Sequence, residues 1–379
     1  MKLILSDDNA HLKFAPLTLT RPLSELRLGL FTASERWMLL SRELPQEVET
    51  NNPYLIHAIS KPSISDENVM INSRVIPTKA LVDEILALQP NQELYYQNTW
   101  IAKRGKNGTV LECVNPPVAV LENRWDLYLK NDAVLQSDFE FFIKHSTSST
   151  LSKTNTVIGD PSMIFLEAGA VVEASILNTT SGPIYLGKNS EIMEGCMIRG
   201  PFSLAEGAVV KMGAKIYGAT SIGPYCKVGG EISNSIFLAY SNKGHDGFIG
   251  NAYIGAWCNL GADTNCSNLK NNYGNVKTYC FETKKMIQTD VTFMGVFMGD
   301  HSKCSINTMF NTATVVGVSA NVFSSGFPAK MIPSFAWGPD MEKFQFDKAL
   351  EVSESMMKRR GLSLSASEKV ILEEIFKNS

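Results

Sequence analysis

The chain has 379 residues, of which 44% are hydrophobic and 19% are charged, and its formal net charge is −3. This length exceeds one compact core of ordinary size, so we expect two domains, and the composition is that of a folded globular protein. The charge gives no reason to expect a nucleic acid partner, and the longest basic run, Lys358-Arg359-Arg360, is expected on a solvated helix face.

No apolar stretch approaches the roughly 18 residues that a membrane helix needs. The apolar start before Asp7 and Asp8 is too short for a signal peptide. The seven cysteines are widely spaced and form no Cys-x-x-Cys pair, which argues against zinc and for free thiols in a reducing compartment. We therefore expect a cytoplasmic protein with no membrane partner and no bound metal such as zinc.

The first 144 residues alternate short strands with helical stretches. Strands are expected at 2–6, 69–71, 94–96, 100–103 and 118–121. Amphipathic patterns predict helices over 30–40 and 78–88, the second entered through Pro77-Thr78. This alternation predicts an α/β domain over residues 1–144, followed by a linker over the Ser/Thr-rich stretch 145–156.

A six-residue repeat dominates the chain after this linker. Counting by six, eight successive positions are aliphatic: Leu186, Ile192, Ile198, Leu204, Val210, Ile216, Ile222 and Val228. An α-helix rotates by about 240° over six residues and would scatter these positions around its axis. A coil with three flat faces, each turning one aliphatic residue inward, explains the step, and such coils must stack to bury their inner faces. The repeat predicts a left-handed parallel β-helix over residues 157–335.

The repeat continues in one earlier and two later blocks. These are Ile158, Ile164, Ala170 and Ile176, then Phe248, Ile254, Leu260 and Cys266, then Met298, Cys304, Phe310, Val316 and Val322. The phase breaks at 178–183, 239–247 and 267–297. Loops that leave a rigid scaffold often carry function, although such a scaffold also tolerates insertions.

The longest interruption, 267–297, is rich in apolar side chains. They are Leu269, Tyr273, Val276, Tyr279 and Phe281. We expect either a neighbouring subunit or the loop's own coil to cover them, because leaving them in water is unfavourable.

The six-residue period is lost over residues 336–379. Helical patterns cover 340–360 and 367–377. Ser365 or Ser367 is the expected cap of the second helix, with Glu368 in its first turn. These patterns predict a short helical C-terminal extension.

The start of the chain is similar to a known family. Ile4-Leu5 followed by Pro16-Leu17-Thr18-Leu19-Thr20-Arg21-Pro22-Leu23 resembles the opening of sugar-1-phosphate nucleotidyltransferases. Coupled to a hexapeptide β-helix, this opening resembles the bifunctional GlmU-like family, which joins N-acetylglucosamine-1-phosphate uridyltransferase and acetyltransferase activities. The resemblance covers roughly residues 1–335. It implies a nucleotidyltransferase-like α/β domain followed by an acyltransferase β-helix.

The first domain departs from this family where nucleotide chemistry would need it. The glycine-rich phosphate loop of the family is replaced by residues 6–11, which contain two carboxylates and no glycine. The position of its Mg²⁺-binding aspartate falls on Arg74. Arg21, Arg27 and Arg74 could still bind a phosphorylated sugar. We expect a binding or structural domain, with a Mg²⁺-dependent sugar-1-phosphate nucleotidyltransferase as the alternative.

The β-helix keeps more of the family's pattern. Residues 242–250, followed by Ile254-Gly255 and 259–262, resemble the acetyltransferase stretch of the family and place His245 on its catalytic histidine. A histidine titrates near neutral pH and can take a proton from an amine or hydroxyl that attacks a thioester. The alternative is that His245 is one surface histidine among five. If so, His301 is the next candidate base.

The same resemblance implies contacts to the acceptor. It assigns acceptor or oxyanion contacts to Asn259 and Asn268, and a substrate contact to Lys277. Phe248 and Gly229 stand where the family has a phosphate-binding tyrosine and arginine. Because these ligands are missing, glucosamine 1-phosphate is not assumed to be the acceptor.

The end of the repeat array carries a motif for coenzyme A. The stretch 326–332, Gly-Phe-Pro-Ala-Lys-Met-Ile, resembles the closing motif of hexapeptide acyltransferases, whose lysine lies near the phosphates of coenzyme A. We therefore expect Lys330 and Ala262 to contact acetyl-CoA or another acyl-CoA. A proline turn that ends the β-helix would also explain the motif.

These expectations together describe a hexapeptide-repeat acyltransferase that acts on a sugar, sugar phosphate or nucleotide-sugar. His245 would be the base, and Asn268 with backbone N–H groups would stabilise the oxyanion. Its flat outer faces predict a homotrimer with sites between neighbouring subunits. The alternatives are a sugar-nucleotide pyrophosphorylase and a non-catalytic sugar-nucleotide-binding protein.

Overall fold

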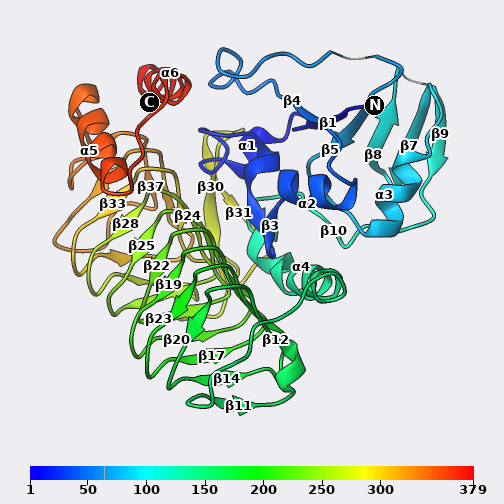
Figure 1. Ribbon diagram of the computed structural model, residues 1–379. Coiled ribbons are helices and arrows are strands. Elements are labelled where there is room, and N and C mark those ends of the chain that lie inside the picture. The colour runs from blue at the N-terminus through cyan, green and yellow to red at the C-terminus, as the bar shows by residue number, and fades with distance from the viewer. Residues whose placement is uncertain (64, 107) are drawn as a thin grey trace.

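The computed structural model describes residues 1–63, 65–106 and 108–379. An N-terminal α/β domain lies beside a three-sided parallel β-helix, and two C-terminal helices sit at the end of the β-helix remote from its first coil (Figure 1). This arrangement confirms the fold class that the sequence predicted. Within the described ranges, no helix combines the length and apolar character that crossing a membrane requires.

The N-terminal domain is built on a six-stranded sheet of order β4-β1-β5-β8-β7-β9. The elements of the domain are β1 (Leu3–Ser6), α1 (His11–Phe14), the 3-10 helix Leu23–Glu25, β2 (Arg27–Leu28), β3 (Phe31–Thr32), α2 (Ala33–Leu40), β4 (Gln46–Glu49), β5 (Val69–Asn72), β6 (Val75–Ile76), α3 (Lys79–Leu86), β7 (Gln92–Tyr96), β8 (Thr99–Arg104), β9 (Thr109–Glu112), β10 (Ala119–Val120) and α4 (Asp126–Ile143). The strands and two helices expected from sequence are all present, but α4 was not expected. Its inward stripe includes the buried polar residues Asn131 and Asp138, which hide the apolar period.

Three parallel sheets form the sides of the β-helix. Sheet I contains β11 (Thr156–Ile158), β14 (Ile176–Asn178), β17 (Met197–Arg199), β20 (Lys215–Tyr217), β23 (Glu231–Ser233) and β26 (Phe248–Gly250), and is extended by the pair β29 (Asn265–Cys266) and β34 (Met309–Phe310). Sheet II contains β12 (Ile164–Leu166), β15 (Ile184–Leu186), β18 (Phe202–Leu204), β21 (Thr220–Ile222), β24 (Ile236–Ala239), β27 (Tyr253–Ala256), β32 (Phe297–Met298), β35 (Val315–Val316) and β37 (Met331–Ile332). Sheet III contains β13 (Val171–Val172), β16 (Glu191–Ile192), β19 (Val209–Val210), β22 (Lys227–Val228), β25 (Asn242–Lys243), β28 (Asn259–Leu260), β33 (Lys303–Cys304), β36 (Asn321–Val322), β38 (Ala336–Trp337) and β39 (Glu342–Lys343).

Five further elements complete the fold. They are the 3-10 helix Pro161–Met163, the antiparallel hairpin β30 (Lys277–Cys280) and β31 (Lys285–Gln288), and the C-terminal helices α5 (Phe346–Lys358) and α6 (Ala366–Lys377). Ser365 and Glu368 form a reciprocal capping box at the start of α6, as expected. Helix α5 begins later than the expected residue 340, because the chain first adds β39 to sheet III.

The central six-residue repeat points inward as the sequence predicted. All eight aliphatic positions from Leu186 to Val228 are buried in one continuous core. Ile184 pairs with Phe202 and Phe202 with Thr220, a step of 18 residues, which is three faces of six.

The phase predicted for three other positions is wrong by one residue. Ile158 and Ile176 are exposed, whereas Leu177 is buried and Val157 packs against the core. The first coils are longer than 18 residues, since Thr156 pairs with Ile176 and Ile176 with Met197. Counting backwards by six therefore loses the register. Phe248 likewise faces outward, and its neighbour Ile249 is the buried residue.

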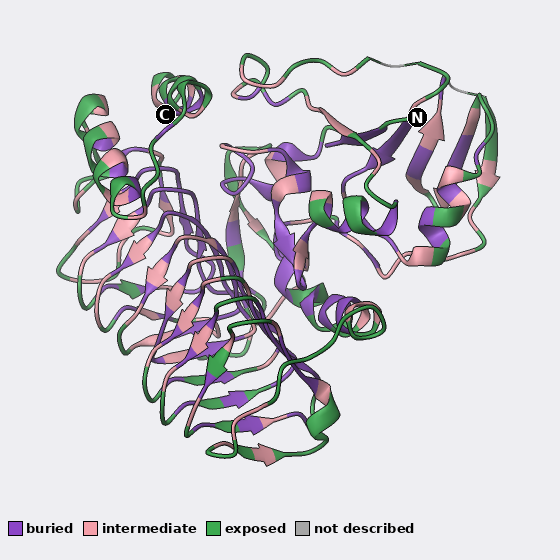
Figure 2. Cartoon of the chain, in the orientation of Figure 1, coloured by how far each residue is buried: buried purple, intermediate pink, exposed green. Residues whose placement is uncertain are grey.

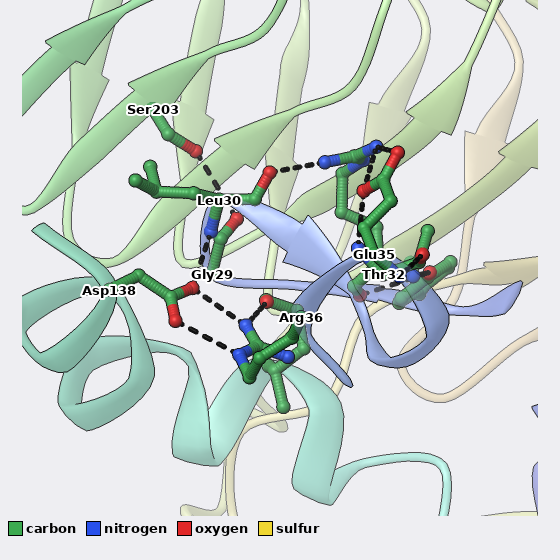
Figure 3. Close-up of polar contacts among 10 residues, drawn as sticks. Gly29, Leu30, Thr32, Glu35, Arg36, Asp138 and Ser203 are labelled. Carbon is green, nitrogen blue, oxygen red and sulfur yellow. Dashed lines mark hydrogen bonds and ion pairs between the residues drawn. The ribbon is translucent and has the colours of Figure 1, made fainter. Parts of the chain in front are cut away.

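The N-terminal domain is fixed to sheet II through buried polar contacts as well as apolar ones (Figures 2 and 3). Asp138 on α4 accepts hydrogen bonds from Arg36 at 2.9 and 2.6 Å and from the N–H of Leu30 at 2.9 Å. Ser203 donates to the carbonyl of Gly29, and the N–H of Arg27 donates to the Tyr253 hydroxyl at 2.9 Å. The N-terminal domain and the β-helix therefore share one buried core.

The long interruption after β29 is covered by the N-terminal domain of the same chain. Val276 is fully buried, and Arg124 donates a hydrogen bond to Thr278 at 2.8 Å. The loop's own coil, one of the two covers expected from sequence, also contributes, because Thr278 donates to the carbonyl of Ala313 at 3.3 Å. The cover by the N-terminal domain was not expected. Tyr273 at the tip of the loop remains 74% exposed.

Candidate functional site

The main cavity of the described chain is a groove of about 810 Å³ between sheet III and helix α5. Its floor follows the coils of β22, β25, β28 and β33, and Val352, Ser355, Met356 and Arg359 of the C-terminal extension form its opposite wall. We call this cavity the sheet III groove.

Strand register aligns the floor of the groove. Lys227 pairs with Asn242, Asn242 with Asn259, and Asn259 with Lys303. Parallel strands lie about 4.8 Å apart, so these four side chains form a straight row along the β-helix axis. The row carries a cation at each end and amides between them.

One edge of the groove is built from stacked aromatic side chains. Tyr225, Tyr240 and Trp257 occupy the same corner position in successive coils, each with φ between 54° and 60°. The rings of Tyr225 and Tyr240 lie 5.1 Å apart, and those of Tyr240 and Trp257 lie 4.2 Å apart and nearly parallel. Bulky residues rarely adopt positive φ, and such backbone strain is often found at functional sites.

His245 lies at the other edge of the groove, on the short loop between β25 and β26. Its side chain is exposed, and the loop beneath it is fixed by Lys243. Lys243 is fully buried and donates from Nζ to the carbonyls of His245 and Asp246, the latter at 2.7 Å. Burial lowers the pKa of Lys243 to about 8. The imidazole is therefore accessible on a backbone that the core holds in place.

The groove carries strong positive charge. Lys211, Lys227, Lys303, Arg359 and Arg360 line it, and no carboxylate does. None of these five forms an ion pair with another described residue. Partial burial lowers the pKa of Lys227, and repulsion from Arg360 and Lys211 lowers it further. Burial also lowers the pKa of Lys303 to about 8.

Two of the residues that the sequence assigned to the site lie beside His245. Asn259 and Ala262 both line the sheet III groove. Asn268 does not, because it follows β29 at the far edge of sheet I, where its Nδ2 donates to Asn251 at 2.7 Å. Within one chain, His245 and Asn268 are therefore on opposite edges of sheet I.

Lys330 lies on the same edge of sheet I as Asn268. Its Nζ is 3.4 Å from Oγ1 of Thr312, and its pKa is lowered by partial burial and by the nearby Lys270. Lys277 is exposed on hairpin strand β30, outside the groove lining. The structure thus separates the predicted coenzyme A contact from the predicted base by the width of one sheet.

Sequence comparisons match parts of the chain to known proteins. A family model for sugar nucleotidyl transferases matches residues 3–147. A bifunctional protein GlmU from Cupriavidus pinatubonensis is 27% identical over 193 residues, which cover 45% of this chain and 41% of the relative. A second GlmU, from a Janthinobacterium species, is 22% identical over 259 residues, 58% of this chain and 51% of the relative. The chain resembles the GlmU-like family.

The chain spans about half the length of the GlmU relatives that it matches. Among solved structures, an Arabidopsis UDP-N-acetylglucosamine acyltransferase matches 57% of this chain and 78% of its own, with 13% identity and a TM-score of 0.21. The GlmU-like resemblance that the motifs predicted is confirmed.

The arginines expected to bind phosphate in the GlmU-like first domain are all paired with carboxylates. Arg21 forms an ion pair with Asp300 of the β-helix. Arg27 pairs with Glu35 at 3.1 Å. The third arginine, Arg74, contacts Asp8 at 2.8 Å and Glu122 at 2.7 Å. Each guanidinium is thereby neutralised.

The two carboxylates of the loop that replaces the phosphate-binding glycines also have partners within the chain. Asp7 accepts hydrogen bonds from the N–H of Leu23 and from Thr50, and burial raises its pKa to about 6. Asp8 is bound to Arg74 and to Asn72. In the described part of the chain, no group of three acidic, histidine or cysteine side chains could hold a metal ion. The donor set of this loop does not fit Mg²⁺.

Sequence reasoning missed most of the groove. It placed Lys358-Arg359-Arg360 on a solvated face, whereas Arg359 and Arg360 line the groove and Arg360 donates to the carbonyl of Tyr225 at 3.4 Å. A usable signal was present in the repeat itself. Glycine or asparagine occupies the positive-φ corner in earlier coils, at Gly169, Asn189 and Gly207, whereas Tyr225, Tyr240 and Trp257 occupy it beside the groove.

The fallback base, His301, occupies the next corner after Trp257 along the coil stack. It is 6% exposed, and burial lowers its pKa to about 4. It borders a separate cavity of about 190 Å³ between the N-terminal domain, the β-helix and α6. His245 is therefore the accessible histidine of the sheet III groove.

Proposed function

We propose that the chain transfers an acyl group from an acyl-CoA to a sugar, sugar phosphate or nucleotide-sugar, with His245 as the general base. The observation that carries the proposal is the exposed imidazole of His245 at the edge of a groove that is lined by cations and amides. Such a groove suits an anionic acceptor, whose reactive hydroxyl or amine would face the imidazole.

The chemistry needs one proton acceptor and one set of oxyanion donors. His245 would take the proton of the acceptor as its oxygen or nitrogen attacks the thioester carbon. The carbon–sulfur bond then breaks, and the same proton passes to the departing thiolate of coenzyme A. The amide of Asn259 is positioned in the groove to orient the acceptor. Asn268 supplies the oxyanion contact only if a neighbouring chain presents its own edge of sheet I.

The acyl-CoA would lie along sheet I, next to the groove. Ala262 borders the groove beside His245, which is where the thioester must arrive. Lys330 and Lys270 of a neighbouring chain, at the opposite edge of its own sheet I, would supply positive charge for the phosphates of coenzyme A.

A coupled thiol-release assay with acyl-CoA and a panel of sugar nucleotides tests the proposal. His245→Ala should lower turnover by about 10²–10⁴-fold, the usual contribution of a general base. The matched control is His57→Ala, because His57 is also exposed but belongs to the N-terminal domain. Both variants should keep the wild-type melting temperature. Full activity in His245→Ala would assign the base elsewhere.

A second candidate function is nucleotidyl transfer by the N-terminal domain, which the family match over residues 3–147 favours. The paired arginines and the engaged Asp8 weigh against it. Release of pyrophosphate from a nucleoside triphosphate and a sugar 1-phosphate, dependent on Mg²⁺, would establish this activity.

A further inference from the structure

The sheet III groove has a composition that is unfavourable without a ligand. Five cationic side chains face a cavity with no carboxylate in its lining. A solvated surface would let lysines extend apart, but here helix α5 covers the strands and Lys227 is repelled by both Lys211 and Arg360. Like charges held together in a partly buried space create a strong site for an anion.

The cations are concentrated at one end of the groove. Lys211 and Lys227 come from adjacent coils and are offset by two residues along the strand, because Lys227 pairs with Val209. Arg360 reaches over them from the C-terminal extension, since its Nη2 bonds the carbonyl of Tyr225, two residues before Lys227. Three cations from two walls fit a diphosphate better than a single phosphate.

The two edges of the groove indicate what the diphosphate is attached to. Tyr240 and Trp257 stack on each other along one edge of the groove, so the edges of their rings form an aromatic border against which a base can pack. Oδ1 of Asn242, in the row between the edges, is buried and lacks a hydrogen-bond partner, so it is available to a ligand donor. His245 occupies the opposite edge.

We propose that the sheet III groove binds the nucleoside diphosphate part of a nucleotide-sugar. The base lies against Tyr240 and Trp257, the diphosphate is held by Lys211, Lys227 and Arg360, and the sugar reaches His245. That the bound sugar is the acyl acceptor rests on the proposed function, whereas the binding itself does not. The C-terminal extension is then part of the binding site.

Calorimetric titration of the full chain tests this assignment. The probes are ADP, GDP, UDP and CDP, their monophosphates, and coenzyme A, which carries the same diphosphate chemistry. At least one nucleoside diphosphate should bind at least tenfold more tightly than its monophosphate. Lys227→Met keeps the apolar stem and Arg360→Gln keeps hydrogen-bonding capacity, and each should weaken that binding about tenfold or more.

The control is Lys188→Ala, because Lys188 is exposed on the same β-helix outside the groove. It should leave the affinity unchanged, and melting curves confirm that all three variants fold. Equal affinity for diphosphate and monophosphate, or equal affinity in Lys227→Met and wild type, overturns the assignment. Displacement of the nucleotide by coenzyme A, with coenzyme A binding lost in Lys227→Met, also overturns it, because the groove would then hold the acyl donor.

This experiment separates the inference from the proposed function. Nucleotide binding that depends on Lys227, without thiol release from any acyl-CoA, supports the groove assignment and rejects acyl transfer. Thiol release that depends on His245, without binding of any nucleoside diphosphate, rejects the groove assignment alone.

Discussion

Corner residues of the β-helix show how one backbone position can serve packing in one coil and chemistry in the next. Gly207 adopts the positive φ of this corner without a side chain, whereas Tyr225, Tyr240 and Trp257 adopt it and stack their rings. The inward aliphatic positions could be predicted from sequence, because one side chain in six must enter the core. The side chains at the corners could not be predicted, since the repeat determines only the backbone conformation there.

The free energy of unfolding at acid pH should depend on the protonation of the buried His301. Its pKa is about 4 in the folded chain and about 6.5 when unfolded, so acidification protonates the unfolded state first and stability falls. The loss between pH 6.5 and 4 should reach about 3 kcal/mol relative to His301→Asn, which tolerates the φ of 60°. Asp300, Arg21 and Lys303 surround the ring and are common to both proteins.

Chemical denaturation of both proteins across this pH range provides the measurement. Asp7 acts in the opposite direction, because its raised pKa of about 6 lets the folded state bind a proton first. The comparison between wild type and His301→Asn removes this contribution. Parallel stability curves for the two proteins would show that His301 titrates normally.

Helix α4 is one of the elements that join the two halves of the chain. Its side chains could not be recognised from sequence as a core-facing stripe, because Asn131 and Asp138 interrupt the apolar pattern. Asn131 accepts from the N–H of Gly29 and donates to the carbonyl of Ala219, so its amide bridges the domain and the β-helix. Only the assembled interface explains why these polar residues are buried.

Arg36→Leu should destabilise the chain by about 3–5 kcal/mol, because it leaves the buried carboxylate of Asp138 without its charge partner. Urea denaturation measures the change. Lys79→Leu is the control, since the Lys79–Asp83 pair on α3 is exposed and its loss should have little effect. Equal effects of the two substitutions would show that the interface does not depend on this pair.

At the scale of the whole molecule, sheet I is an open side of the β-helix in the described chain. The N-terminal domain covers sheet II and α5 covers the later coils of sheet III, whereas Ile176, Met197 and Tyr217 on sheet I are each about 40% exposed or more. Sequence could predict a three-sided prism but not which side stays free. Because His245 and Lys330 are separated across this sheet, the proposed acyl transfer predicts a homotrimer in which one chain's Lys330 edge meets the neighbour's His245.

Complementation between inactive chains tests this shared site most directly. Light scattering should first give three times the 41.8 kDa chain mass. His245→Ala and Lys330→Ala are each expected to lose acyl transfer, but equal co-expression should restore about a quarter of wild-type thiol release, the statistical share of sites with both residues intact when the two chains assemble at random into trimers. No recovered activity in verified mixed trimers, or a fully active monomer, would contradict the account.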